Sequence, residues 1–393
     1  MSQRLISRSG DLSQLRAEGY ELEVRNGFLL LDHVPYVNAA REVRYGSLVS
    51  NLELAGDVTV KPENHVVYMT GEMPCDHRGQ ALMKVINSSG RQQLAPDVEI
   101  DHMFSTKPSA GYADYHEKMT THVRILAAQA QAIEPNATAT TFPVVADDDE
   151  ESVFRYIDTA TGRAGIGAAS ERLKTGPIGI IGLGGTGAYL LDLVSKTPVE
   201  SIHLFDGDRF AQHNAFRAPG GTSIEDLAER PQKVHYFARQ YSKIHRGIVP
   251  HDCYLAEDNL SQLERLSFVF IAIDRNEPKR AIVEKLEAEK IPFIDVGMGI
   301  RSVDGALAGL LRITTSTPSQ RAHVKEKRRI PYAPGSDDDE YAANIQIADL
   351  NALNATLAVL RWKKLLGFYS DIGGEHNSIF ATSDACLINE DFA

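Results

Sequence analysis

The sequence predicts an α/β protein with a Rossmann-like, doubly wound, mostly parallel sheet, preceded by a smaller N-terminal domain that is mainly β or α+β. Three observations predict this. An apolar run at 178–183 enters a glycine-rich turn and then a helix-like segment. Further apolar runs at 202–205 and 268–273 have the composition of parallel strands that are covered on both faces. Residues 20–68 instead alternate apolar and polar side chains between Gly and Pro, which is typical of half-buried strands.

The domain boundary is expected at residues 141–152. Pro and Thr residues, followed by the acidic run 147–151, interrupt the apolar periodicity there, and such compositions make linkers. We therefore expect an N-terminal accessory domain at 1–140 and a second domain at 153–393. In the first, we expect strands at 20–25, 28–32, 57–60 and 65–68 and a helix at 119–131. In the second, we expect strands at 178–183, 202–205, 268–273 and 292–296 and a helix at 279–290. A long helix at 348–362, with apolar residues all round, should pack in the core or at a dimer interface.

Composition excludes several classes of protein. The net charge of −12 disfavours nucleic-acid binding, which needs a basic surface. No apolar run approaches the about 18 residues of a membrane span, and the N-terminus has no export signal. Three cysteines without a Cys-x-x-Cys pair make no disulfide framework, so a reducing compartment fits best. We expect a cytoplasmic protein that binds neither nucleic acid nor membrane.

The glycines at 182, 184, 185 and 187 carry the first functional signal. Gly182, Gly184, Gly185 and Gly187 let the backbone turn sharply and approach a ligand closely, and the free N–H groups of the following helix attract negative charge. With Asp206 at about 20 residues' distance, the spacing also fits a dinucleotide fingerprint. The turn therefore predicts a nucleotide without specifying which, and a turn required only by packing is the alternative.

The polar residues that follow decide between nucleotides. After the turn and Asp206, the segment contains Asp208, Asn214, Arg217, Lys233 and, at the end of the apolar strand, Asp274. This combination resembles the ThiF/MoeB/HesA family, including the adenylation domains of ubiquitin-activating enzymes, over about residues 151–393. A dehydrogenase has no use for polar and cationic groups at these positions.

The chemistry of carboxylate adenylation fits these residues, because a weak anionic nucleophile must attack the α-phosphate of ATP. Arg217 and Lys233 would neutralise the triphosphate through charge-assisted hydrogen bonds worth about 1.5–3 kcal/mol each. Asn214 can bind phosphate without adding charge, and Asp206 would take the ribose hydroxyls. Asp274 would hold Mg²⁺, a hard ion that favours carboxylate oxygen. Each of these residues has an ordinary alternative as a cap or a surface charge.

The resemblance implies further properties. They are ATP and Mg²⁺ as cofactors, a homodimer, and a partner protein that is small, ubiquitin-like or sulfur-carrying, with a Gly-rich C-terminus. Arg155 would reach into the ATP site of the partner subunit, and the polar segment at 314–340 would guide the partner protein's tail. Arg217 is followed by Ala218 where many members carry Gln, so one polar contact is lost. Without Cys-x-x-Cys pairs, no structural zinc is expected.

The cysteines raise the question of how the activated acyl group is transferred. No cysteine lies between Cys253 and Cys386, where activating enzymes usually carry the thioester nucleophile. Cys75 follows His65 by ten residues, which resembles the stretch ending at the acceptor cysteine of ubiquitin-conjugating enzymes, although the His-Pro-Asn signature is absent. Either the chain stops at the acyl-adenylate or Cys75 accepts the modifier. The alternative for Cys75 is a small buried apolar residue.

We therefore expect an ATP-dependent adenylyltransferase that activates the C-terminal carboxylate of a small ubiquitin-like modifier. Adenylation of a sulfur-carrier protein is the nearest alternative. An NAD(P)-dependent oxidoreductase would leave Asn214, Arg217 and Lys233 without a role. An inactive nucleotide-binding platform would tolerate the loss of Arg217 and Lys233.

Overall fold

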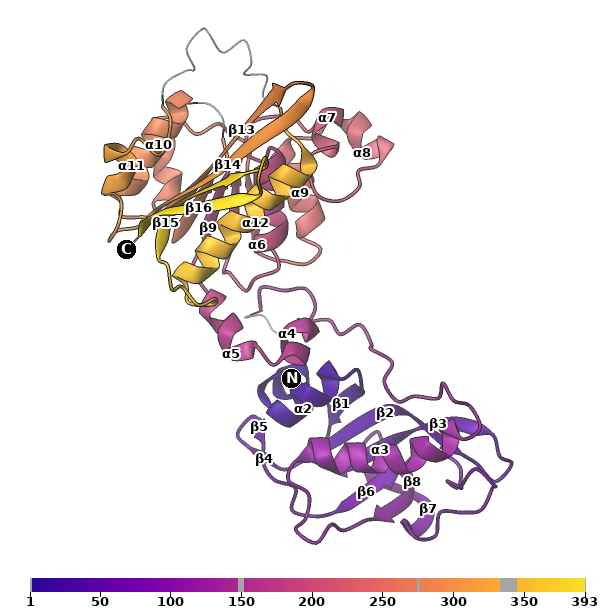
Figure 1. The fold of residues 1–393 in the computed structure, drawn as a ribbon. Helices are drawn as coiled ribbons and strands as arrows, with labels where there is room; N and C mark the ends of the chain where they lie inside the picture. Colours follow the sequence, from indigo (N-terminus) through magenta and orange to yellow (C-terminus); the bar gives the residue numbers. More distant parts are fainter. Residues whose placement is uncertain (1, 148–151, 274–275, 333–344, 393) are drawn as a thin grey trace. The chain divides into compact units, whose positions relative to one another are not determined.

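The structure is a computed structural model that describes residues 2–147, 152–273, 276–332 and 345–392. The chain divides into two compact units, which are described separately (Figure 1). The N-terminal unit comprises residues 1–151 and 156–166, and the C-terminal unit comprises residues 152–155 and 167–393.

The N-terminal unit is an antiparallel sheet with one long helix across it (Figure 1). The strand order is β1-β2-β3-β6-β8-β7. The strands are β1 (Glu21–Arg25), β2 (Phe28–Val37), β3 (Val43–Asn51), β6 (Val66–Met69), β7 (Ile86–Ala95) and β8 (Val98–Ser105), with a small hairpin of β4 (Leu54–Ala55) and β5 (Val58–Thr59). The helices are α1 (Ser2–Arg8), α2 (Gly10–Ala17), α3 (Tyr115–Gln131) and α4 (Thr159–Ala164). The expected α+β character of this part of the chain is confirmed.

Helix α3 holds this unit together. It begins at residue 115, earlier than expected, because the Asp114 side chain accepts a hydrogen bond from the Glu117 N–H at 2.8 Å and so caps it. Its buried face places Met119 and Leu126 in the core formed with the strands. The same helix also buries two ionisable residues, Lys118 and His122, both 0% exposed.

His122 is a basic group in apolar surroundings. Its ring lies between those of Phe104 and Tyr112, at centroid distances of 6.1 and 6.0 Å, and its Nδ1 lies 2.9 Å from the carbonyl oxygen of Lys118. Burial lowers the pKa of His122 to about 4. Burial likewise lowers the pKa of Lys118 to about 8. Because the charged imidazolium is disfavoured, protonation must oppose folding of this unit.

We predict that His122 makes the N-terminal unit acid-sensitive. Between pH 6.5 and 4 the unfolded chain binds a proton at His122 that the folded chain does not, so stability falls as pH falls through this window. Relative to His122→Leu, the wild type should lose about 2.5 kcal/mol more of its unfolding free energy between pH 7 and 4.5. Urea unfolding followed by far-UV circular dichroism measures this. His77→Leu, at an exposed histidine, is the control, and equal losses in all three proteins would contradict the prediction.

The C-terminal unit is built on an eight-stranded sheet of order β11-β10-β9-β12-β13-β14-β15-β16. The first five strands are parallel, and the pairs from β13 to β16 are antiparallel. The strands are β9 (Ile178–Ile181), β10 (Ile202–Phe205), β11 (Ile248–His251), β12 (Phe268–Ile271), β13 (Phe293–Val303), β14 (Ala306–Ser316), β15 (Glu375–Ala381) and β16 (Cys386–Phe392). Strand order reverses at β9, which has β10 on one side and β12 on the other, and ligands of doubly wound sheets bind at such a switch point.

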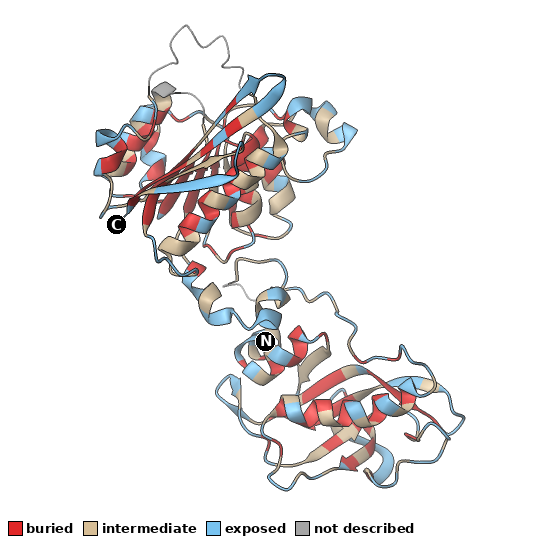
Figure 2. Ribbon diagram, viewed as in Figure 1, coloured by how far each residue is buried: buried red, intermediate tan, exposed pale blue. Residues whose placement is uncertain are grey.

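Helices cover both faces of the parallel part of this sheet, so its strands are buried (Figure 2). On one face α6 (Gly185–Val194) packs against α12 (Ala348–Leu365), and α9 (Lys233–Tyr241) joins the same core. Trp362 of α12 is 0% exposed, with its ring 6.0 Å from that of Phe270. On the other face α10 (Asn276–Ala288) contributes Ile282, Val283 and Leu286. The doubly wound architecture and the core packing of the long helix are confirmed.

The remaining helical segments are short and lie at the ends of the strands or before β9. They are α5 (Gly167–Ser170), η1 (Glu171–Leu173), α7 (Gln212–Ala215), α8 (Ile224–Glu229), η2 (Leu260–Leu263) and α11 (Ala322–Glu326). None of the helices in the described ranges is long and apolar enough to cross a bilayer.

The segment after β14 differs from the loop that was expected. Helix α11 lies within this segment. Two basic residues that follow the helix, Lys327 and Arg329, form ion pairs with Asp391 of β16, and Nε of Arg329 lies 2.8 Å from Oδ2 of Asp391. The basic stretch therefore fastens this segment to the last strand. The acidic stretch that follows lies outside the described residues.

Candidate functional site

The glycine turn between β9 and α6 is packed so closely that most of its glycines are obligatory. Gly182 has φ +87°, and a Cβ there would lie 2.7 Å from the carbonyl oxygen of Ala272. A Cβ on Gly187 would lie 1.8 Å from the carbonyl oxygen of Gly182, and one on Gly185 would lie 2.0 Å from Nδ2 of Asn351. Only Gly184 has no atom closer than 3.8 Å, and it lines a cavity. Packing alone therefore explains three glycines, and Gly184 is the one that a ligand would explain.

Asp206 connects this turn to the next strand. It follows β10 and is 8% exposed. One carboxylate oxygen accepts a hydrogen bond from the Leu183 N–H at 2.7 Å, and the other accepts from the Asp208 N–H at 2.8 Å. The carboxylate thus fixes the backbone of both loops at the carboxyl edge of the sheet. A carboxylate oxygen can accept more than one hydrogen bond, so the oxygen that accepts from Asp208 can take another donor.

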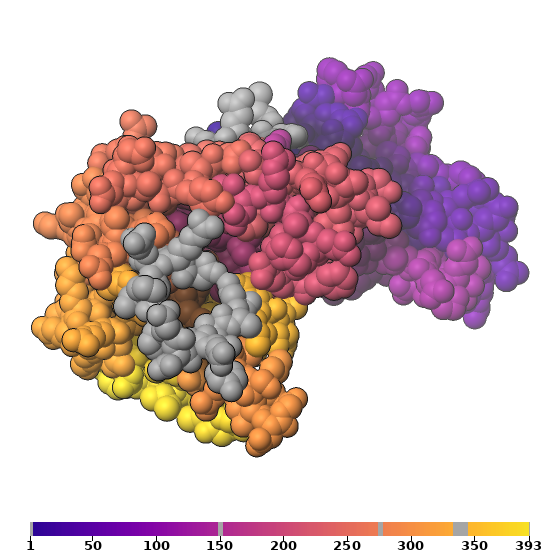
Figure 3. Space-filling model, turned by 90° about the horizontal axis from the view of Figure 1, so that it is seen from above, coloured from indigo at the N-terminus to yellow at the C-terminus, as the bar shows by residue number. Residues whose placement is uncertain are grey.

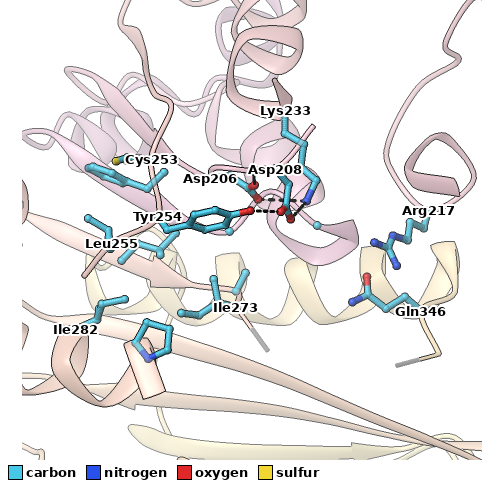
Figure 4. Close-up of a pocket in the computed structure, with 16 residues that line it drawn as sticks. Asp206, Asp208, Arg217, Lys233, Cys253, Tyr254, Leu255, Ile273, Ile282 and Gln346 are labelled. Atoms are coloured by element: carbon cyan, nitrogen blue, oxygen red, sulfur yellow. Dashed lines mark hydrogen bonds and ion pairs between the residues drawn. The ribbon is translucent and has the colours of Figure 1, made fainter. Parts of the chain in front are cut away.

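Lys233, the first residue of α9, is buried beside two carboxylates (Figure 4). Its Nζ lies 2.7 Å from Oδ2 of Asp208 and 3.5 Å from Oδ2 of Asp206, and the residue is 5% exposed. The Tyr254 hydroxyl also donates to Asp208. A buried ammonium needs such partners, since an unpaired charge in this position is costly.

Arg217 presents its charge differently. It lines the cavity, and no carboxylate pairs with it among the residues that the structure describes. Its Nε likewise has no hydrogen-bond partner within them. Its backbone N–H donates to the carbonyl oxygen of Asn214 at 3.1 Å. Asn214 is 3% exposed and uses its side-chain oxygen to accept from the Ala211 N–H, while its Nδ2 has no partner in the described ranges.

One cavity lies at the switch point of the sheet and has two chemically distinct ends (Figure 4). Of the candidate residues, it is lined by Gly182, Gly184, Asp206, Asp208, Arg217 and Lys233. Gly185, Gly187 and Asn214 are not among its lining residues. Cys253, Leu255, Ile273 and Ile282 make one end apolar. The opposite end carries Arg217 and Gln346, with Asp206, Asp208 and Lys233 between the two ends. Helices α7 and α8 are labelled in Figure 1, and Figure 3 shows the molecule in space-filling form from above that view. An apolar end suits a nucleobase, and a cationic end beside a helix N-terminus suits phosphate.

Comparison with known protein families identifies the family of the C-terminal part of the chain. The ThiF family matches residues 123–378, which is more than half of the chain. The chain belongs to the ThiF family. Residues 10–159 match a domain of unknown function (DUF6791). The predicted family membership of the C-terminal part is thus confirmed.

Individual relatives of this ThiF protein are distant. The tRNA threonylcarbamoyladenosine dehydratase of Escherichia coli (strain K12) is 26% identical over 127 residues, which cover 30% of this chain and 44% of that protein. The match thus spans less than half of that relative's length. Among solved structures, selenomethionine PaaA is 16% identical, with a TM-score of 0.43 and coverage of 57% of this chain and 76% of that one. E. coli MccB with AMPCPP and MccA is 14% identical, with a TM-score of 0.45 and coverages of 60% and 71%.

Arg155 is not among the residues that line this cavity. The Nε of Arg155 donates to the carbonyl oxygen of Ser242 at 3.2 Å, and its N–H donates to that of Ile244 at 2.9 Å, so it is anchored to its own chain. Its contribution to a partner's site stays a prediction. Asp274 lies outside the described residues, and its metal role also stays a prediction. Elsewhere in the described ranges, no three His, Cys, Asp or Glu side chains are grouped to hold a metal ion.

Cys75 belongs to the N-terminal unit and is 2% exposed. Its Sγ donates to the carbonyl oxygen of Met73 at 3.4 Å. Burial, with a smaller effect of Asp76, raises the pKa of the Cys75 thiol. Because the thiolate is the nucleophile, this environment gives no support to an acceptor role, which remains untested.

Sequence reasoning missed three residues at the ThiF site: Gln346, Asn351 and Tyr254. The Gln346 side chain accepts from the Gly185 N–H at 3.4 Å, and Oδ1 of Asn351 accepts from the Thr186 hydroxyl at 2.8 Å. Asn351 and Asn354 are buried three residues apart in a helix with a largely apolar sequence. That pair of asparagines is a signal that could have marked α12 as part of the site, and nothing in the sequence marks Tyr254.

We predict that Asp206→Asn destabilises the C-terminal unit by about 1–3 kcal/mol, because one of two buried N–H donors then faces an amide NH₂ instead of an oxygen. Asp208→Asn is the matched control. Its side chain is 45% exposed and Lys233 keeps Asp206, so it should cost less than about 1 kcal/mol. Urea unfolding followed by fluorescence of Trp362, the single tryptophan, measures both. Equal losses would show that Asp206 does not hold the turn.

Proposed function

We propose that this protein is an ATP-dependent adenylyltransferase that activates the C-terminal carboxylate of a small ubiquitin-like modifier. The observation that carries the proposal is the cavity of a ThiF-family chain at the sheet's switch point, apolar at one end and cationic at the other. Adenylation of a sulfur-carrier protein uses the same chemistry and is the second candidate. The two are distinguished by whether the partner protein acquires a thiocarboxylate.

The lining of the cavity supports a role for each of these residues. The base would lie against Leu255 and Ile282, and the ribose against the remaining lone pairs of Asp206. The phosphates would lie between Gly184 and Arg217, whose guanidinium lacks a carboxylate partner among the described residues. Before ATP binds, Asp208 neutralises the buried ammonium of Lys233. When ATP binds, a phosphate oxygen would take the place of Asp208 beside Lys233.

Mg²⁺ would be held by Asp274, which follows the apolar run 268–273 in the sequence, and it would neutralise charge on the leaving pyrophosphate. Within the described residues, Arg217 and Lys233 supply the positive charge that the attack on the α-phosphate requires.

We predict that Mg·ATP, and not NAD⁺ or NADP⁺, stabilises the protein against unfolding. Ligand at about 100 times its dissociation constant adds about 2.7 kcal/mol. Arg217→Gln, Lys233→Met and Asp274→Ala should each reduce this stabilisation, because each removes a contact with the triphosphate or its metal. Arg265→Gln, at an exposed arginine, should not. Stabilisation by a dinucleotide alone would return the site to the oxidoreductases, which need none of these cations.

ATP–pyrophosphate exchange tests the activity itself, and exchange without any modifier tail would remove the modifier from the proposal. The homodimer has a separate test, in which inactive Arg155→Gln and Lys233→Met proteins are mixed. If Arg155 completes the partner subunit's site, a mixed dimer contains one intact site, and exchange activity should reappear. Activity that stays at the sum of the two variants would contradict the contribution of Arg155.

A further inference from the structure

Asp208 is the movable partner of Lys233 in the nucleotide cavity. Its side chain is 45% exposed, whereas that of Asp206 is 7% exposed and accepts hydrogen bonds from two backbone N–H groups. The backbones of Asp208 and Lys233 are joined, because the N–H of Lys233 donates to the carbonyl oxygen of Asp208 at 2.9 Å. A phosphate that takes a place beside the Lys233 ammonium must therefore move the Asp208 side chain, since the other groups are fixed.

The Asp208 carboxylate is held from two sides. Its Oδ2 lies 2.7 Å from Nζ of Lys233, and its Oδ1 accepts a hydrogen bond from the Tyr254 hydroxyl (Figure 4). A half-exposed carboxylate that lacked the second contact would be free to turn towards water. The hydroxyl therefore keeps Asp208 in an orientation that neutralises Lys233.

Tyr254 is itself fixed in place, although it is 54% exposed. Its ring rests on Gly207, where a Cβ would lie 2.8 Å from both Cδ2 and Cε2 of the ring. Its carbonyl oxygen accepts from Nδ2 of Asn259 at 2.9 Å, and Oδ1 of Asn259 accepts from the Ala256 N–H at 2.9 Å, so the loop after β11 is closed on itself. A hydroxyl on a ring that is already ordered can orient its acceptor at little cost in entropy.

Asp208 has the charge and the position of a phosphate oxygen. It is an anionic oxygen at hydrogen-bonding distance from a buried ammonium, so it competes with a phosphate for Nζ of Lys233. A competitor that belongs to the same chain acts at a high effective concentration, and fixing its side chain raises that concentration further. Lys233 is thus paired both before a phosphate arrives and after it departs.

We infer that Tyr254 is a positioning residue, which holds Asp208 as an internal competitor for Lys233 and thereby favours the release of pyrophosphate. This role rests on the proposed function, which supplies the reaction that makes pyrophosphate. In that reaction a carboxylate oxygen bonds to the α-phosphorus of ATP as the bond from the α-phosphorus to the bridging oxygen breaks. Pyrophosphate leaves with that oxygen and its electron pair, and Asp208 returns to Lys233 in its place.

Binding of inorganic pyrophosphate tests this role, because pyrophosphate and Asp208 compete for the same ammonium. Isothermal titration calorimetry of the full-length protein in the presence of Mg²⁺ gives the dissociation constant. Tyr254→Phe keeps the ring and removes only the hydroxyl, so pyrophosphate should bind about two- to tenfold more tightly, the range that corresponds to one net hydrogen bond. Asp208→Ala removes the competing charge and should tighten binding about tenfold or more. A merely structural role for Tyr254 predicts weaker binding instead.

The double variant shows whether Tyr254 acts through Asp208. If it does, Tyr254→Phe has no further effect in the Asp208→Ala protein. Gly207→Ala should resemble Tyr254→Phe, because the new Cβ displaces the ring. Tyr369→Phe is the matched control, at a 42% exposed tyrosine of the same unit that is not among the residues lining the cavity, and it should leave the dissociation constant unchanged. Far-UV circular dichroism and the fluorescence of Trp362, buried in the same unit, verify that each variant folds.

The possible failures have different meanings. Weaker or unchanged pyrophosphate binding in Tyr254→Phe, or an effect of Tyr254→Phe that persists in the Asp208→Ala protein, would overturn the role of Tyr254 and leave the nucleotide site standing. Pyrophosphate binding that stays unmeasurable in every variant of a protein that binds Mg·ATP would overturn it as well. If the wild type does not bind Mg·ATP, the proposed function fails and the role of Tyr254 fails with it.

Discussion

The site in the C-terminal unit depends on one carboxylate. Asp206 accepts hydrogen bonds from Leu183 of the glycine turn and from Asp208 of the next loop, and lies 3.5 Å from the ammonium of Lys233. It thereby joins β9, β10 and α9 at the point where the strand order reverses. The turn that would receive phosphate and the lysine that would contact it are positioned by the same two oxygen atoms. The carboxylate that we expect to bind the ribose therefore also holds the loops of the site in place.

Charge balance distinguishes two cavities of the C-terminal unit. In the nucleotide cavity two carboxylates accompany Lys233, and Arg217 lacks a carboxylate partner in the described part of the chain. A second cavity lies over the antiparallel part of the sheet and is lined by Lys279 and Arg312, which both pair with the carboxylate of Asp295 within the described ranges.

The sequence was informative where function and fold use local patterns. The apolar strands and the glycine turn were predicted because strand, turn and helix are encoded over a few residues, and Asp206, Arg217 and Lys233 line one cavity with that turn. The long β13–β14 hairpin, the two strands after it and the paired role of the basic stretch at Lys327 and Arg329 were not foreseen, since they depend on contacts far apart in the chain. Tyr254 was missed for the same reason, whereas Asn351 and Asn354, buried polar residues in a largely apolar helix, did leave a signal in the sequence.

The packing of the glycine turn changes how such a motif is interpreted in evolution. Gly182, Gly185 and Gly187 are fixed by neighbouring backbone and by Asn351, independently of any ligand. A descendant that had lost its nucleotide would keep them under selection for folding alone. Gly184 and Arg217 are the positions that would drift. A glycine motif can therefore be conserved after the activity has been lost. Residues that packing does not require, such as Gly184 and Arg217, are the better indicators of whether a homologue still binds the nucleotide.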